Sequence, residues 1–274
     1  MNSQVDVIVI GDSKEGREAI KALASERPTI KFAFISREFK SFTTHDYLNV
    51  EYIKDEVIFT DYKNRLFGCY LKNGDRIYGT HLVIATGLAY EPLVINRKQV
   101  PCVFNTAEDI PKTARHLPAV VVGQTNSDVK FALDVAKKYA HVYLCTEGLT
   151  IENITPANVK KLAETDNLVT LPNASIVKAN VTDGQLKSVD LSNYSTVTCN
   201  AIFIKTKASP ETSFVSDKLI SKNELGYLRP TNISQSLLVP KCFAIGSCTE
   251  KSTQKMRVAM IDAILNDFNG GVKC

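Results

Sequence analysis

The sequence lacks several features that mark special classes of protein. Tryptophan is absent, and no apolar run approaches the roughly 18–20 residues that span a bilayer. The 33 Lys and Arg residues are scattered and barely outnumber the 29 Asp and Glu residues, so a net charge of +4 gives no argument for nucleic acid binding. With 44% hydrophobic and 23% charged residues, the 274-residue chain has the composition of a globular protein of about two domains.

Paired cysteines are also missing. The seven cysteines form no CxxC motif and no metal-ligand spacing with the four histidines, so we expect no metal site. Unpaired cysteines in a chain of this size are typical of a reducing compartment. Residues 1–11 have neither a basic region nor a small-residue cleavage site, so they do not read as a secretory signal. We therefore expect a cytoplasmic protein without a membrane span.

The first part of the chain has the pattern of a parallel sheet. Residues 5–11 form a short buried strand, residues 14–25 have the apolar spacing of a helix, and residues 31–36 form a second buried strand. This order within about thirty residues predicts a βαβ unit. Residues 49–71 predict a small antiparallel meander, and residues 81–87 another buried strand.

The opening pattern returns after a proline-containing segment, residues 92–118, which we interpret as a linker. Residues 118–123 predict a strand, residues 127–139 a helix and residues 141–147 the next strand. Short strands follow between residues 167 and 205. The chain closes with a strand over residues 241–248 and a helix over residues 256–268. Two βαβ starts in one chain indicate a duplicated architecture.

The first turn, which we define as residues 11–16, carries candidate binding chemistry. A strand that ends in glycine before a helix gathers free N–H groups at the positive end of the helix, where a diphosphate binds. Gly11 and Gly16 match the outer glycines of the GxGxxG fingerprint, but Ser13 replaces the middle one. An ordinary strand-to-helix turn is the alternative interpretation.

An acidic residue at the end of the second strand would bind the ribose of such a nucleotide. Ser36 stands there, followed by Arg37 and Glu38. Glu38 could serve if the strand runs two residues longer, whereas Ser36 offers only a weaker, neutral hydrogen bond.

The second turn, residues 123–128, keeps only Gly123 of the fingerprint. Asp128 suits the positive end of the following helix but would repel a diphosphate. Glu147, after the next strand, is well placed for a ribose 2′-hydroxyl, and no Arg pair follows it to bind a 2′-phosphate. If this part binds a nicotinamide cofactor, NADH is therefore favoured over NADPH.

The order of these parts resembles the flavoprotein oxidoreductases with two dinucleotide-binding domains, in their thioredoxin reductase and NADH oxidase branches. The segments that carry the similarity are LVIATGLAYEPL (82–93), VPCVFNTAEDI (100–110), 119–144 and 221–248. The resemblance implies an α/β fold of two Rossmann-like, three-layer domains, each with a small antiparallel meander. The NAD-type domain, residues 104–217, would be inserted in the FAD-type domain, residues 1–103 and 218–274.

The resemblance also implies a set of binding residues. The ATG segment would approach FAD, and the last helix would begin beside the flavin O2. Where the family has Gly-Asp after the closing strand, this sequence has Gly246-Ser247. Where the family usually has GGGNSA, this sequence has the second turn. The residues implied for FAD are Gly11, Ser13, Gly16, Ser36, Arg37, Glu38, Thr86, Gly87, Gly246, Ser247, Met256 and Arg257. Those implied for NADH are Gly123, Thr125, Asn126 and Glu147.

Two functions are compatible with these residues. The first is an FAD-dependent oxidoreductase that moves electrons from NADH through the flavin, which carries the chemistry. Because CxxC is absent, its acceptor would be oxygen, a quinone, a small carrier protein or an external disulfide. The alternative is a non-catalytic relative, a nucleotide sensor or protein-binding partner, because hydroxyl residues stand at positions 13, 36, 125 and 247. We assign no catalytic residue, and the sequence is compatible with a homodimer.

Three further residues are candidates for chemistry beside a flavin. Cys248 follows the closing turn, Cys274 ends the chain and His45 lies in a loop. A buried inert thiol is the favoured interpretation of Cys248, and an exposed thiol and a loop histidine without a role those of the other two.

Overall fold

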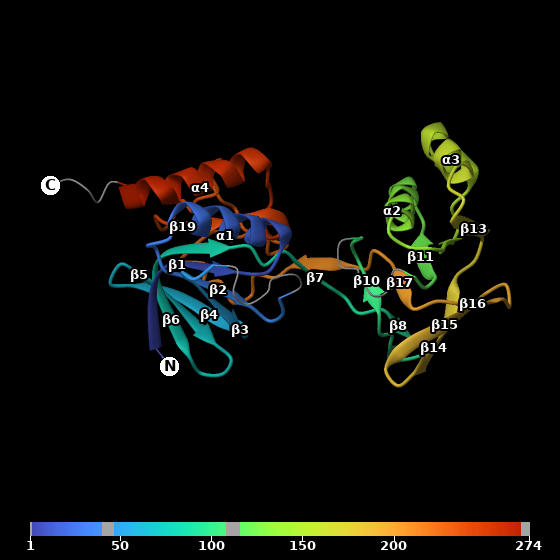
Figure 1. Cartoon of the computed structure of the whole chain (residues 1–274), viewed down its shortest axis with the longest axis horizontal. Helices are drawn as coiled ribbons and strands as arrows, with labels where there is room; N and C mark the ends of the chain where they lie inside the picture. The colour runs from blue at the N-terminus through green and yellow to red at the C-terminus, as the bar shows by residue number, and fades with distance from the viewer. Residues whose placement is uncertain (1, 40–46, 108–115, 270–274) are drawn as a thin grey trace. The chain divides into compact units, whose positions relative to one another are not determined.

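The computed structural model describes residues 2–39, 47–107 and 116–269. The chain folds as two compact units, which are described separately (Figure 1). The first unit comprises Met1–Ala89 and Ala208–Cys274, and the second comprises Tyr90–Lys207. Among the described residues, no helix combines the length and apolarity that a membrane span requires.

A mixed sheet forms the centre of the first unit. Its strands lie in the order β3-β2-β1-β6-β5-β4, and β19 also pairs with β6. The long β6 has two sets of neighbours, because its first half is antiparallel to β5 and its second half is parallel to β19. The elements of this unit are β1 (Asn2–Ile10), α1 (Lys14–Glu26), β2 (Phe32–Ser36), β3 (Val50–Lys54), β4 (Val57–Lys63), β5 (Leu66–Leu71), β6 (Arg76–Ile84), β7 (Leu88–Tyr90), which ends at the unit boundary, β18 (Ala208–Pro210), β19 (Cys242–Ala244) and α4 (Gln254–Asn269).

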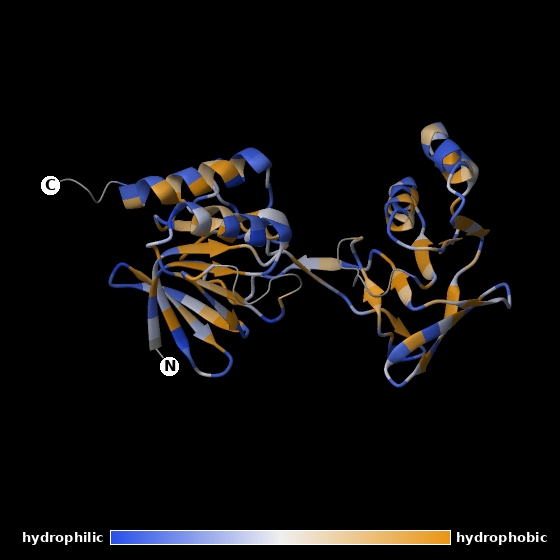
Figure 2. Cartoon of the chain, viewed as in Figure 1, coloured by the Kyte–Doolittle hydropathy of each residue, from blue (hydrophilic) through white to orange (hydrophobic). Residues whose placement is uncertain are grey.

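Side-chain alternation along the strands gives this sheet two covered faces. Val7 and Val9 of β1 pack with apolar residues of α1 and α4, and both helices lie over that face (Figure 1). Ile8 and Ile10 point to the opposite face. There they pack with apolar side chains of β5 and of residues 214–228, which follow β18. Because successive strand residues point to opposite faces, a strand buried on both sides reads as a continuous apolar run. Figure 2 shows these strands as the most hydrophobic part of the unit.

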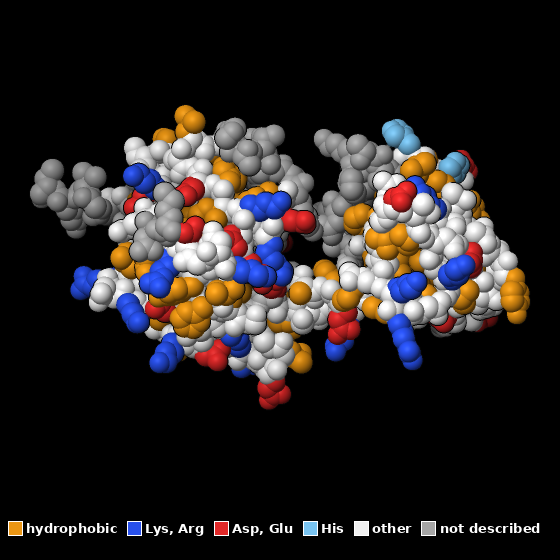
Figure 3. Space-filling view, turned by 90° about the horizontal axis from the view of Figure 1, so that it is seen from below, with side chains coloured by type: hydrophobic (Ala, Val, Ile, Leu, Met, Phe, Trp, Pro, Cys, Tyr) orange, Lys and Arg blue, Asp and Glu red, His pale blue; other side chains and the backbone are white. Residues whose placement is uncertain are grey.

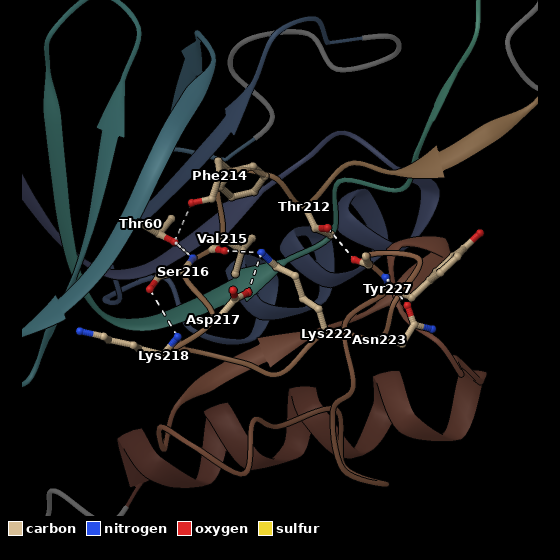
Figure 4. Close-up of polar contacts among 11 residues, drawn as sticks. Thr60, Thr212, Phe214, Val215, Ser216, Asp217, Lys218, Lys222, Asn223 and Tyr227 are labelled. Atoms are coloured by element: carbon tan, nitrogen blue, oxygen red, sulfur yellow. Dashed lines mark hydrogen bonds and ion pairs between the residues drawn. The ribbon is translucent and has the colours of Figure 1, made fainter.

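The segment that returns from the second unit is held on the sheet by polar contacts (Figure 4). The Thr60 hydroxyl on β4 donates to the carbonyl of Phe214 at 3.2 Å and accepts the N–H of Ser216 at 3.3 Å. The Lys222 ammonium donates to the carbonyl of Val215 at 2.6 Å and pairs with Asp217 at 3.0 Å. These bonds fix an irregular segment whose apolar side chains complete the core beneath the sheet.

The second unit repeats the layered plan at smaller size. Its parallel sheet has the order β10-β17-β11-β12-β13 and packs against α2 and α3 on one face. The antiparallel strands β14-β15-β16 cover the other face. The elements are β8 (Val94–Ile95), β9 (Lys98–Gln99), β10 (Val103–Phe104), β11 (Ala119–Gly123), α2 (Asn126–Ala136), β12 (Val142–Thr146), α3 (Pro156–Ala163), β13 (Leu168–Pro172), β14 (Ile176–Thr182), β15 (Gln185–Leu191), β16 (Thr196–Thr198) and β17 (Ala201–Phe203).

The predicted α/β class with two Rossmann-like units is confirmed, and two details of the prediction are wrong. Residues 50–54 do not begin the antiparallel meander, because β3 pairs in parallel with β2 and extends the main sheet. The expected linker is not a simple connection either, because β10 pairs with β17 inside the sheet of the second unit. The sequence prediction also lacked α3.

The unit boundaries differ from the expected ones at 103/104 and 217/218. They lie at Ala89/Tyr90 and Lys207/Ala208. The physical reason is core membership. Val100 is buried in the apolar core of the second unit, whereas Phe214 and Val215 are buried in that of the first.

Candidate nucleotide-binding site

The first turn is built from backbone packed so closely that only glycine fits. Gly11 has a φ of +105°, and a Cβ there would lie 2.4 Å from the Cα of Thr86. A Cβ on Gly16 would lie 2.3 Å from the carbonyl oxygen of Gly11. The two glycines therefore allow α1 to start directly against the ends of β1 and β6.

Ser13 is the N-cap of α1, and its hydroxyl accepts the N–H of Gly16 at 3.1 Å. This bond satisfies one of the N–H groups that a helix leaves without an internal partner. A hydroxyl can accept one bond and still donate its own proton. Ser13 at the middle position of the fingerprint therefore keeps a donor that can face an anion.

Three segments far apart in the sequence meet around Gly87. A Cβ on Gly87 would lie 3.5 Å from the hydroxyl of Ser247 and 3.7 Å from the Cβ of Ser13. Gly87 is buried and has a φ of +76°, whereas Ser247 is exposed. The structure thus brings together the first turn, the end of β6 and the closing turn after β19, at the carboxyl ends of the strands. Nucleotide ligands of open α/β sheets bind at such an edge.

The closing turn is held by hydroxyl groups and lies against α1. The N–H of Gly246 donates to the Ser252 hydroxyl at 3.0 Å, and the Thr86 hydroxyl donates to the carbonyl of Glu211 at 2.7 Å. A Cβ on Gly246 would meet Glu15 Oε2 at 3.1 Å. The Glu15 carboxylate therefore reaches across from α1 to the closing turn.

An open pocket of about 630 Å³ borders these segments. It lies between the first turns of α1 and α4 and the closing turn. Its charged lining is mixed, because Lys14 and Arg257 face Glu15 and Glu18. The complete lining is Lys14, Glu15, Glu18, Gly246, Ser247, Thr249, Ser252, Thr253, Gln254 and Arg257.

The start of α4 is tied to its surroundings. The N–H of Met256 donates to the Thr253 hydroxyl at 3.2 Å. The Arg257 guanidinium pairs with Glu18 of α1 at 2.6 Å. Arg257 therefore bridges two helices beside the pocket.

The residues expected at the ribose lie at the end of β2, next to the first turn. The N–H of Gly11 donates to the carbonyl of Ile35 at 2.9 Å. The hydroxyl of the following Ser36 donates to the carbonyl of Glu38 at 2.7 Å. Arg37 pairs with Glu211 and more loosely with Glu56, at 3.9 Å. The strand ends at Ser36, so Glu38 belongs to the exposed loop that follows.

The second turn is closed by its own carboxylate. Asp128 Oδ2 accepts the N–H of Gln124 at 3.1 Å and, from Thr125, the N–H at 3.0 Å and the hydroxyl at 2.8 Å. Lys205 Nζ lies 3.1 Å from Asp128 Oδ1. Burial acts to raise the pKa of the Asp128 carboxyl, but the hydrogen bonds from Thr125 and Gln124 and the neighbouring Lys205 outweigh it and lower the pKa. The carboxylate is therefore ionised at neutral pH.

The other predicted residues of the second turn also have internal partners. Asn126 Oδ1 accepts the N–H of Thr155 at 3.0 Å and the side-chain amide of Asn158 at 2.9 Å, so it joins the starts of α2 and α3. Glu147 accepts the side-chain amide of Gln124 at 3.3 Å. A Cβ on Gly123 would lie 3.1 Å from the Cβ of Asp128, which leaves little room above this glycine.

The described cysteines do not form an exchange pair. All six are free, and Cys69, Cys145, Cys199, Cys242 and Cys248 are buried. Burial raises the pKa of Cys145 to about 11 and that of Cys242 to about 12, and it raises the pKa of Cys248 as well. These thiols stay protonated and are poor nucleophiles. His45 and Cys274 lie outside the described residues.

Sequence reasoning missed Glu211 and Lys205. Glu211 joins Thr86 and Arg37, and Lys205 neutralises the carboxylate in the second turn. No local motif marks either residue, since both meet their partners only through the fold. The charge of Asp128 was recognised, but not its contact with two amides.

The two units differ in how well they fit a dinucleotide. The first unit fits FAD, because Gly11 and Gly16 let α1 start directly against the strand ends and the hydroxyl groups of Ser13 and Ser247 lie at the same edge. The second turn does not fit a nicotinamide nucleotide, because the ionised carboxylate of Asp128 already accepts the amide protons that a diphosphate would need.

Comparison with known proteins agrees with this architecture. The structure is similar to thioredoxin reductase from T. acidophilum, with a TM-score of 0.65, 16% identity and coverage of 98% of this chain and 99% of that one. Thioredoxin reductase from Lactococcus lactis gives a TM-score of 0.63, 16% identity and coverage of 97% and 98%. No curated protein matches the sequence. The model of the family described as pyridine nucleotide-disulphide oxidoreductase matches residues 7–246. The chain therefore belongs to the pyridine nucleotide-disulphide oxidoreductase family.

Proposed function

We propose that the chain is an FAD-dependent oxidoreductase whose flavin nucleotide is bound by the first unit. The observation that carries this proposal is the meeting of Ser13, Gly87 and Ser247 at the carboxyl edge of the sheet, beside an open pocket. FAD would supply the electron transfer when bound. The first turn would hold the diphosphate, and Ser36 at the end of β2 would lie nearest the ribose.

The chain's own side chains would position this group. The N-terminal end of α1 provides a positive electrostatic environment for the diphosphate, and the Ser13 hydroxyl adds a donor. Ser247 replaces the usual acid of the closing turn with a neutral group. The Arg257–Glu18 pair fixes the start of α4 beside the pocket. The electron acceptor would be oxygen, a quinone, a small carrier protein or an external disulfide, because none of these requires an internal CxxC.

Uptake of FAD by the whole purified chain tests the proposal. We expect flavin fluorescence to be quenched on binding, and the bound flavin to bleach under anaerobic reduction and recover its colour with an acceptor. Gly87→Asn places a side chain between Ser13 and Ser247 and should abolish uptake. Gly74→Asn is the matched control, because Gly74 also has a positive φ, of +92°, and a Cβ there would meet nothing within 4 Å.

A non-catalytic relative is the second candidate function. The observation that favours it is the closed second turn, in which Asp128 accepts both amide protons. A chain that takes up no FAD, and whose Gly87→Asn variant behaves as the parent does, would overturn the first function and favour the second.

A further inference from the structure

The second unit carries an internal substitute for a bound anion. Asp128 follows Gly123 at the same spacing at which Gly16 follows Gly11. At position 16 there is no side chain, and a Cβ there would lie 2.3 Å from the carbonyl oxygen of Gly11. At position 128 the carboxylate folds back over the turn, and one oxygen accepts two backbone N–H groups and the Thr125 hydroxyl at 2.8–3.1 Å. Asp128 is the third residue of α2, and its contact with the Thr125 amide is the capping box of that helix.

Lys205 completes this internal anion site. Its ammonium pairs with the second oxygen of Asp128 at 3.1 Å, donates to the Ser127 hydroxyl at 2.9 Å and lies 5.6 Å from the centre of the Phe131 ring. Lys205 lies two residues after the end of β17, so the sheet sets its position beside the turn. The negative charge is therefore neutralised within the unit, and no ligand is needed to balance it.

The polar side chains expected to bind the rest of a nucleotide already have hydrogen-bond partners within the unit. Asn126 Oδ1 accepts hydrogen bonds from Thr155 and Asn158 at the start of α3. The Glu147 carboxylate accepts one from the side-chain amide of Gln124. A diphosphate entering the turn would have to displace the Asp128 carboxylate from both amides and would also have to break its pair with Lys205. Both requirements oppose binding.

We propose that Asp128, held by Lys205, keeps nicotinamide nucleotides out of the second unit, so that this unit serves as a scaffold and not as the NADH-binding domain. Any donor of electrons to a flavin in the first unit then reaches it without using the second turn. This inference does not depend on FAD binding, because it concerns contacts within Tyr90–Lys207 alone.

Titration of the whole chain with NADH, followed by nucleotide fluorescence and by calorimetry, tests the inference. We expect no saturable binding by the parent chain up to about 1 mM NADH. Asp128→Ala removes the carboxylate and should tighten binding by about tenfold or more. Asp134→Ala is the matched control, because it removes an acid from the exposed side of the same helix, where Asp134 pairs with Lys137.

A second substitution tests whether the gain in NADH affinity arises in the second unit. Adding Glu147→Ala to Asp128→Ala should reduce the new affinity, whereas it would not affect a nucleotide bound in the first unit. If Asp128→Ala fails to fold, Asp128→Asn keeps an acceptor for the turn, removes the charge and should still bind NADH more tightly than the parent. The inference is overturned if the parent binds NADH saturably and Glu147→Ala weakens that binding, or if removing the Asp128 charge gives no more affinity than Asp134→Ala. FAD uptake is measured in a separate experiment, so the NADH result and the FAD result are independent of each other.

Discussion

The guanidinium of Arg257 and the carboxylate of Glu18 form an ion pair of 2.6 Å that joins the first turn of α4 to α1. Residues 18 and 257 are separated by nearly the whole chain, and both line the pocket at the edge of the first sheet. The pair fixes the distance between the two helix starts that border this pocket. Its geometry therefore matters more for the site than its modest energy.

Arg257→Gln should weaken this connection between α1 and α4. The Arg257 side chain is 18% exposed and that of Glu18 is 40% exposed, so solvent screens the pair and we expect a loss of only about 0.5–1 kcal/mol. Urea unfolding of Arg257→Gln, of Glu18→Gln and of the double variant measures the coupling between the two side chains. Lys255→Gln, which removes one charge from an exposed position of α4, is the control. Additive effects of the two changes would show that the pair contributes nothing.

His81 makes the stability of the first unit depend on pH. It is 1% exposed, its Nε2 lies 3.2 Å from Asp267, and its Nδ1 lies 2.9 Å from the Thr80 hydroxyl. Burial lowers the pKa of His81 from its usual 6.5 despite the opposing carboxylate. A folded-state pKa below the unfolded one means that the unfolded chain binds the proton more readily, so stability is full above about pH 6.5 and falls as the pH decreases.

Denaturant midpoints measured on either side of about pH 6.5 test this dependence. The parent should lose stability on the acid side, and His81→Gln should show a smaller loss over the same interval. His141→Gln changes an exposed histidine of the second unit and should retain the parent's dependence. Stability that rises on acidification would contradict the assignment.

Gly11→Ala should be severely destabilising. The new Cβ would lie 2.4 Å from the Cα of Thr86 and 2.5 Å from the carbonyl oxygen of Ala85, both backbone atoms that cannot move independently. Overpacking together with the positive φ predicts a loss of about 3 kcal/mol or more. Gly74→Ala meets no atom within 4 Å and carries only the cost of its φ, about 1–2 kcal/mol. Thermal unfolding of the two variants compares them, and equal losses would refute the packing argument.

The buried thiols should not react in the native chain. A variant with Cys102→Ser and Cys274→Ser keeps the five buried cysteines, whose protonated thiols exchange slowly. We expect an aromatic disulfide reagent to titrate none of them in buffer within minutes and all of them in denaturant. Rapid reaction of one thiol in the native state would make that cysteine a candidate electron carrier again.

Charged side chains of both signs lie on the surface of the chain. On the face shown in Figure 3, Lys and Arg side chains alternate with acidic and uncharged ones and form no continuous basic area.

The strands and turns of the main sheets were predictable because their signals are local. The apolar run over residues 5–10 and the return of the same pattern before Gly123 specify buried parallel strands. Glycine at position 11 predicted a tight turn before a helix, and α1 follows as expected. The fate of residues 50–54 was not predictable, because a short strand has no local feature that distinguishes parallel from antiparallel pairing.

Sequence by itself determined the duplicated α/β plan and the positions of both turns, because hydrophobic period and glycine placement act over a few neighbouring residues. Only the tertiary structure decided which groups are bonded in each turn. Ser13 leaves the first turn with a usable donor, whereas Asp128 closes the second with the help of Lys205, which arrives from a distant strand. An ionised carboxylate at a helix start is held over the turn only where the fold brings it amides and a cation, and Lys205 is a partner that no local pattern reveals.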